Sequence, residues 1–134
     1  MALYMLDTNV ASAVIRGHEQ AERRLRALPM DGWCISAITR SELRFGLALK
    51  PEATRLARIV NAWLALAPVA PWDTAAADAH ARLRAQLQLA GTPMGVFDEM
   101  IAAHAQALGA VVVTNNVRHF SRATGLAIED WLGA

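Results

Sequence analysis

The sequence predicts an α/β fold built on a parallel sheet. Short apolar runs alternate along the chain with longer helical patterns, and the composition contains 28 alanines but a single tyrosine. Alanine is the strongest helix former, which argues against an all-β sandwich. Strands separated by helices pair in parallel, because each connection returns the chain to the same end of the sheet. With 54% hydrophobic residues, the chain is also too apolar to remain disordered.

Four short apolar runs are predicted to be buried strands, and a fifth run is expected to add a terminal strand. None is long enough to cross a bilayer, which takes about 20 apolar residues. The predicted strands are 3–6, 33–35, 69–71 and 110–114, with the terminal one around 127–129.

Helical patterns fill the intervals between these strands. Ser36 is placed to cap the helix that follows the second strand, and Asp73 is placed to cap another helix, which Gly91 ends. Apolar residues three and four apart indicate further helices at 20–28 and 52–67.

The length and the cysteine content indicate one cytoplasmic domain spanning residues 1–134. The chain has no internal repeat and no flexible linker, and its lone Cys34 cannot form an internal disulfide, which fits a reducing compartment. The first residues lack a basic leader, and their apolar run stops at Asp7, so we expect neither a signal peptide nor a membrane partner. A net charge of +1 does not by itself point to a nucleic-acid partner.

Oxygen-bearing side chains directly follow two of the predicted strands. Asp7 follows the first strand, and Asn115 and Asn116 follow the fourth. Parallel sheets bind ligands outside the carboxyl ends of their strands, so these residues are candidates for one site. Glu42 and Asp98 are further candidates, although Glu42 also fits a solvated helix surface and Asp98 also fits a helix N-cap.

Converging carboxylates suit a hard cation such as Mg²⁺, which binds through one or two carboxylates together with waters and substrate phosphates. Such a site activates a water and stabilises the charge that develops on a phosphate during displacement. Asp7, Glu42 and Asp98 lie far apart in the sequence, so spacing alone does not bring them together.

Four blocks of sequence resemble the PIN-domain ribonucleases of the VapC toxin type, from bacterial VapBC toxin–antitoxin systems. The blocks occur in order over nearly the whole chain. They are Met5-Leu6-Asp7-Thr8-Asn9; Ile35-Ser36 through Ser41-Glu42-Leu43 with Phe45-Gly46; Gly95 through Asp98 with Ile101-Ala102-Ala103-His104; and Thr114-Asn115-Asn116 with Phe120, Gly125-Leu126 and Asp130-Trp131.

The resemblance implies a three-layer α/β/α sandwich with a central, mostly parallel sheet of four or five strands. It also implies a metal-dependent endoribonuclease whose catalytic acids, Asp7, Glu42 and Asp98, hold Mg²⁺ or Mn²⁺. A fourth catalytic position, often Asp in the family, falls on Asn116, whose amide brings no negative charge and would weaken a second metal site.

The resemblance further implies a toxin that cleaves structured RNA. A tRNA anticodon stem-loop is the expected substrate, with a ribosomal RNA loop as the other family target. The expected partners are a small VapB-type antitoxin and a second copy of the chain in a homodimer, with DNA contacted only through the antitoxin. An Arg or a bulky apolar residue of the antitoxin is expected in the acidic groove.

Neighbouring residues receive supporting roles by the same resemblance. Thr8 and Asn9 are expected to support Asp7, and Thr114 is expected to act in the same way beside Asn116. Arg118 and Arg122 are placed to meet an RNA backbone, although exposed loop arginines fit the pattern as well.

Other polar residues near these motifs receive no catalytic role. Glu99 adjoins Asp98, but neighbours on a helix point about 100° apart, so Glu99 is expected on the surface. His104 is expected to pack inside a helical layer, and His119 shows no spacing typical of a zinc site.

Two other functions compete with the ribonuclease. An inactive PIN-like module that acts only through its antitoxin or operator complex is favoured by Asn116. A haloacid-dehalogenase-type phosphatase also starts with an Asp at a strand end, but it needs a second Asp where this chain has Asn9 and a late catalytic Lys, whereas the sole lysine is Lys50.

Overall fold

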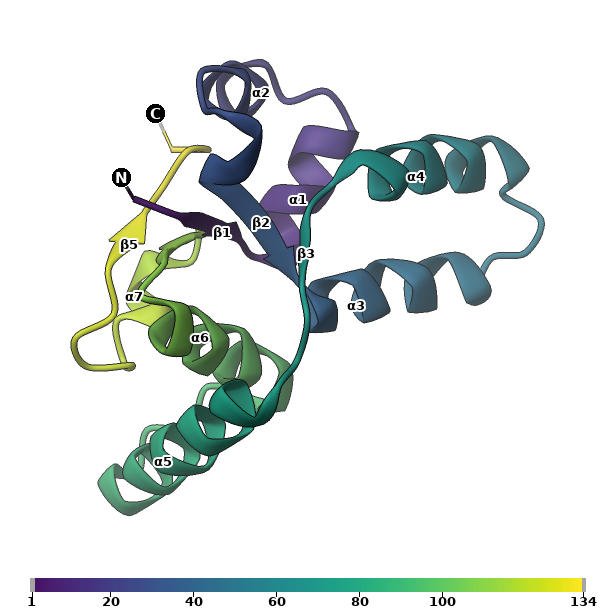
Figure 1. The fold of residues 1–134 in the computed structure, drawn as a ribbon. Coiled ribbons are helices and arrows are strands. Elements are labelled where there is room, and N and C mark those ends of the chain that lie inside the picture. The colour runs from purple at the N-terminus through teal and green to yellow at the C-terminus, as the bar shows by residue number, and fades with distance from the viewer. Residues whose placement is uncertain (1, 134) are drawn as a thin grey trace.

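The computed structural model describes residues 2–133, and its centre is a parallel sheet of five strands in the order β3-β2-β1-β4-β5 (Figure 1). Every strand pair is parallel, with Met5 of β1 in register between Cys34 of β2 and Val112 of β4. All five predicted strands are confirmed. They are β1 (Tyr4–Leu6), β2 (Trp33–Ser36), β3 (Val69–Ala70), β4 (Val111–Val113) and β5 (Ile128–Glu129).

Seven α-helices join these strands within the described residues. None of the seven is sufficiently long and apolar to span a membrane. They are α1 (Thr8–Ile15), α2 (Glu19–Arg26), α3 (Ala37–Ala48), α4 (Thr54–Leu66), α5 (Thr74–Ala90), α6 (Val96–Leu108) and α7 (Val117–Phe120).

The sheet separates two apolar cores, which makes the fold a three-layer α/β/α sandwich. Successive strand residues alternate between the cores, because side chains of a strand point to opposite faces. Met5 and Val112 pack with α5, α6 and α7, whereas Leu6 and Val113 pack with α1, α2 and α4. The predicted fold class is therefore confirmed.

The predicted ends of α3 and α5 are confirmed by their caps. Ser36 Oγ accepts a hydrogen bond from the Ile38 N–H at 3.0 Å, and Asp73 Oδ1 accepts one from the Ala76 N–H at 2.9 Å. Gly91 follows α5 with φ +70°, a left-handed conformation in which glycine avoids the strain of a Cβ.

The alternative of Asp98 as a helix N-cap is wrong. The N-cap of α6 is Gly95, at φ +92°, and Asp98 lies inside the first turn. The side chain of Asp98 is therefore not used to close the start of its own helix.

The four tryptophans pack against the fold. Trp33 stacks at a tilt on Trp63, with ring centroids 5.7 Å apart, and Trp131 is fully buried. Trp72 meets the ring of His104 edge-on at 5.3 Å. His104 is buried, as the sequence predicted for a packing residue.

Helices α3 and α4 lie side by side and extend away from the sheet as an arm (Figure 1). A groove of about 340 Å³ runs between this α3–α4 arm and α1. Its lining is mostly apolar, including Ile15, Leu43, Leu47, Leu49, Leu56 and Val60, and Glu42 lies at its edge.

Candidate functional site

The candidate site lies at the carboxyl edge of the sheet, where four segments meet. Helices α1, α3 and α7 begin there, because each is the next element after a strand. Helix α6 precedes β4 and therefore runs back across the sheet, so its first turn lies at the same edge. Residues from distant parts of the sequence are brought together in this way.

Asp7 stands at the end of β1 and is almost fully buried, with 3% of its surface exposed. Its Oδ1 accepts a hydrogen bond from the Val10 N–H at 2.8 Å, which caps α1, and the Thr114 hydroxyl is a second hydrogen-bond partner. Burial raises the pKa of Asp7 to about 6, although these two hydrogen bonds oppose the rise.

Glu42 comes to the site from the first half of α3. The Thr8 hydroxyl donates a hydrogen bond to Glu42 Oε1 at 2.6 Å, and Thr8 Oγ1 also lies 3.2 Å from Thr39 Oγ1. These contacts hold the Glu42 carboxylate toward the end of β1. The alternative of a freely solvated helix residue is therefore wrong.

Asp98 faces the site from the first turn of α6. Burial raises the pKa of Asp98, and the imidazole of His119 opposes that rise by its charge and by a hydrogen bond. His119 Nε2 lies 3.1 Å from Asp98 Oδ2.

The other two acids lie near Asp7. Burial is the main cause of the raised pKa of Asp7, and the negative charges of Asp98 and Glu42 add to the rise. Across residues 2–133, no group of three or more His, Cys, Asp or Glu side chains is arranged so that it could hold a metal ion. The oxygen donors themselves are of the type that Mg²⁺ prefers, since it binds carboxylates and retains several of its waters.

Thr114 connects β4 to the site and contacts both Asp7 and Asn116. Thr114 is fully buried and bonds Asp7, while its Oγ1 also accepts the Asn116 N–H at 3.0 Å. Thr8 was expected to support Asp7, but its hydroxyl bonds Glu42 instead. Asn9 and Asn116 are exposed at this edge of the sheet.

The two arginines near the site differ in their contacts. Arg118 lies exposed on α7, whereas Arg122 donates a hydrogen bond to the Pro93 carbonyl at 2.7 Å. Arg122 therefore ties the segment after α7 to the loop that precedes α6.

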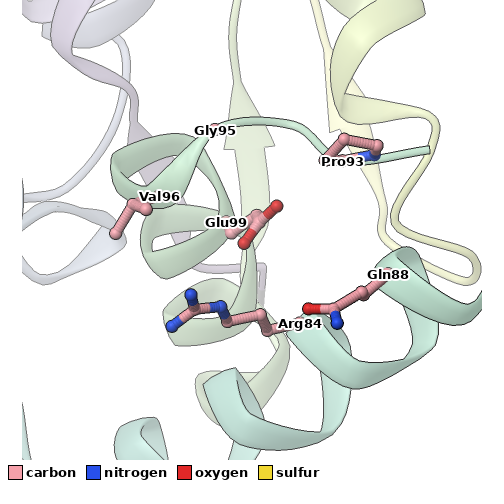
Figure 2. A pocket seen from close by; sticks show the side chains of 6 residues that line it. All are labelled: Arg84, Gln88, Pro93, Gly95, Val96 and Glu99. Atoms are coloured by element: carbon pink, nitrogen blue, oxygen red, sulfur yellow. The ribbon is translucent and has the colours of Figure 1, made fainter. Parts of the chain in front are cut away.

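The prediction that Glu99 lies on the surface is wrong. Glu99 is 5% exposed, and its Oε2 accepts the Met94 N–H at 3.0 Å. Both Asp98 and Glu99 belong to the first turn of α6, and the angle between them turns Asp98 to the site and Glu99 toward α5. Figure 2 shows Glu99 across a hollow of about 380 Å³ from Arg84 and Gln88 of α5.

His119 is the site residue that the sequence pattern did not reveal. Helix α7 begins at Val117, so Asn116 and His119 are three residues apart on one short helical turn. That spacing places His119 near Asn116, and it could have identified His119 as a site residue from the sequence. His104, in contrast, bonds the fully buried Ser36 at 2.8 Å and lies inside the core.

Comparison with known proteins shows which family the chain resembles. The model of the PIN domain matches residues 4–126. The tRNA(fMet)-specific endonuclease VapC of Salmonella typhimurium is 40% identical over 131 residues, with 98% of this chain and 99% of the relative covered. The tRNA(fMet)-specific endonuclease VapC of Shigella flexneri is 37% identical over the same shares of the two chains.

Solved structures of toxin–antitoxin complexes have the same fold. The DNA-bound VapBC of Salmonella typhimurium superposes with a TM-score of 0.89 at 40% identity, covering 98% of this chain and 99% of the other. VapBC2 of Rickettsia felis, bound to a promoter DNA fragment, superposes with a TM-score of 0.88 at 28% identity, covering 96% and 98%. With the PIN domain matched over most of its length and VapC relatives matched from end to end, the chain belongs to the PIN-domain family, among the VapC ribonucleases.

Proposed function

We propose that this protein is the toxin of a type II toxin–antitoxin pair and cleaves RNA as a metal-dependent endoribonuclease. The observation that carries the proposal is the meeting of Asp7, Glu42 and Asp98 at one sheet edge, where burial raises the pKa of Asp7 and the charges of the other two acids add to the rise. Such a concentration of negative charge is costly unless a cation is bound there. The PIN-domain match offers no support for a haloacid-dehalogenase-type phosphatase.

The three acids are proposed to hold Mg²⁺ or Mn²⁺. The bound ion would activate a water for attack on the phosphodiester and stabilise the charge that develops on the phosphate. Asp7 is fixed by Val10 and Thr114, and Glu42 is fixed by Thr8, so both carboxylates are oriented before an ion binds. Asn116 adds an uncharged amide oxygen, which supports a second ion less well than a carboxylate.

A tRNA, cut in its anticodon stem-loop, is the proposed substrate, with a ribosomal RNA loop as the alternative. The support comes from two relatives, which are tRNA(fMet)-specific endonucleases. Arg118 is exposed beside the site and is proposed to contact the RNA backbone. Arg122 is proposed to contribute to RNA binding from the segment after α7, where its side chain bonds the loop that precedes α6.

A VapB-type antitoxin is the proposed partner, and the groove between the α3–α4 arm and α1 is the proposed place for its apolar segment. The support is the groove's apolar lining, together with the complexes formed by similar proteins. DNA would then be contacted only through the antitoxin. We also propose that the toxin is a cytoplasmic homodimer.

End-mapped cleavage of total cellular RNA by the antitoxin-free protein tests the proposed function. Discrete cuts are expected with Mg²⁺ or Mn²⁺, and none with a chelator or with the Asp7→Asn variant. Asp31→Asn is the matched control, because Asp31 is exposed before β2, at the opposite end of the sheet. Uncut RNA from folded wild-type protein in both metals would favour the inactive binding module instead.

A further inference from the structure

The hollow between α5 and the start of α6 combines apolar walls with polar groups. Its volume is about 380 Å³, within the range of about 300–1,000 Å³ that small ligands occupy, and Pro93 and Val96 supply apolar surface. Glu99, Arg84 and Gln88 bring polar side chains to the same hollow (Figure 2). The hollow therefore has the size and the mixed lining of a site for a small organic group.

Glu99 has one carboxylate oxygen that the fold does not use. The residue is 5% exposed, and its Oε2 accepts the Met94 N–H at 3.0 Å. Within residues 2–133, its Oε1 has no hydrogen-bond donor, and neither Arg84 nor Gln88 forms a side-chain hydrogen bond or an ion pair. A nearly buried carboxylate is stabilised by donors, so this arrangement favours a ligand that brings N–H groups.

The hollow and the acidic site lie on two sides of the same helical turn. Asp98 faces the acids and Glu99 faces the hollow, since neighbours on a helix point about 100° apart. A helix with its side chains is about 10–12 Å wide, so a nucleotide that adjoins the phosphate at the acids can place its base in the hollow. Proteins that read RNA commonly bind bases that are splayed out of a loop in this way.

We propose that this hollow binds a guanine base of the RNA, next to the bond that is cut. The inference rests on the proposed ribonuclease function. Guanine matches the lining on two edges, because its N1–H and N2–H groups can donate to Glu99 Oε1 while its O6 and N7 accept from the Arg84 guanidinium. Adenine brings an amino group in place of O6, and the pyrimidines have no N7 acceptor.

Titration of the antitoxin-free protein with GMP, AMP, CMP and UMP in a chelator tests the hollow by itself, with binding followed by the NMR shifts of backbone amides at the start of α6. The four ligands share their phosphate, so differences report the base. We expect GMP to bind about tenfold more tightly than the others.

Two variants are expected to lose this preference. Glu99→Gln keeps an acceptor for the Met94 N–H but turns an amide N–H₂ group toward the guanine donors, and Arg84→Ala removes the guanidinium. Arg82→Ala is the matched control, because Arg82 is also exposed on α5 but lines a different hollow, and it is expected to keep the preference. Equal binding of the four nucleotides by the wild type, or a preference that Glu99→Gln retains, would overturn the guanine site.

Base analogues in a synthetic RNA that the wild type cuts test the two contacts separately. Inosine lacks the N2 amino group that faces Glu99, and 7-deazaguanine lacks the N7 acceptor for Arg84. Each is expected to slow wild-type cleavage about tenfold, and inosine is expected to have no further effect in Glu99→Gln. Cuts with no guanine beside them would contradict the inference but leave the ribonuclease standing. A GMP preference without any cleavage would overturn the ribonuclease and leave a nucleotide-binding site.

Discussion

At the residue scale, Asp7 combines two roles that conflict in the absence of a cation. Its carboxylate caps α1 through the Val10 N–H, which favours folding, yet it is buried close to Glu42 and Asp98. Burial and repulsion both disfavour its charge, and they outweigh its hydrogen bonds, because the pKa is raised to about 6. The site is therefore built at a cost to stability.

The Asp7→Asn variant is predicted to be more stable than the wild type at pH 7.5 without metal. The pKa of Asp7 is raised from 3.8 to about 6 on folding, so folding takes up a proton between those values and stability falls as the pH rises through this window. The ionised group then costs about 3 kcal/mol, from about 1.4 kcal/mol per pKa unit. Asn avoids this cost and still accepts the Val10 N–H.

Urea unfolding in a chelator checks this prediction. The free energy of unfolding of Asp7→Asn is expected to exceed that of the wild type by about 1–3 kcal/mol at pH 7.5 and to match it near pH 4. A difference that does not change with pH would contradict the proposed origin of the effect.

Thr8→Val is predicted to weaken metal binding by about tenfold or more, with little change in stability. The Thr8 hydroxyl orients Glu42 at 2.6 Å, and loss of such supporting contacts commonly costs about 10–100-fold in metal affinity. Thr8→Ser keeps the hydroxyl and serves as the matched control. Calorimetric titration with Mn²⁺ measures both variants, and equal affinities would show that Thr8 does not position Glu42.

At the element scale, the start of α6 determines where Asp98 points. Two hydrogen bonds hold the preceding loop. Glu99 accepts one from the Met94 N–H, and the Arg122 side chain donates the other to the Pro93 carbonyl. The residue patterns predicted the helix, but they did not locate its first residue. Once α6 begins at Val96, Glu99 turns inward, which explains why its predicted surface position is wrong.

Glu99→Ala is predicted to lower the free energy of unfolding by about 1–3 kcal/mol, because the buried Met94 N–H loses its acceptor. Glu99→Gln retains an acceptor oxygen and should lose clearly less. Thermal unfolding of both variants checks this, and equal losses would mean that the hydrogen bond is unimportant. Reduced cleavage by folded Glu99→Ala would further show that the loop positions Asp98.

The elements themselves were readily predicted, because their signals are local. Capping residues such as Ser36 and Asp73 act within a few residues of their own position, and the strands are short apolar runs. The partners of the site side chains were not predicted in the same way. Thr8 bonds Glu42 across 34 positions of sequence, and no local pattern specifies that contact.

At the scale of the whole molecule, the α3–α4 arm places an apolar groove beside the acidic site. Glu42 belongs to both features, since it lines the edge of the groove and bonds Thr8. An antitoxin segment in the groove would therefore lie next to the three acids. Convergence of the acids depends on the order of strands in the sheet, which is why the family resemblance, rather than the spacing, predicted it.

Leu49→Glu is predicted to weaken antitoxin binding by about tenfold or more while RNA cleavage is retained. Leu49 is 64% exposed and lines the groove, and burying a leucine in a complex is worth about 1.5–3 kcal/mol. Leu89→Glu is the control, because Leu89 is 90% exposed on α5, away from the groove. Binding of the operon's antitoxin by calorimetry checks it, and equal losses in both variants would place the interface elsewhere.

Chelation followed by return of the metal, with cleavage of purified tRNA measured at each stage, tests whether the three acids form a metal-dependent site. We predict that wild-type protein loses cleavage when chelated and regains it saturably with Mn²⁺ or Mg²⁺, whereas folded Asp7→Asn regains none and Asp31→Asn behaves like the wild type. Cleavage that persists in the chelator, or that Asp7→Asn performs as well as the wild type, would contradict a metal-dependent site built on the three acids.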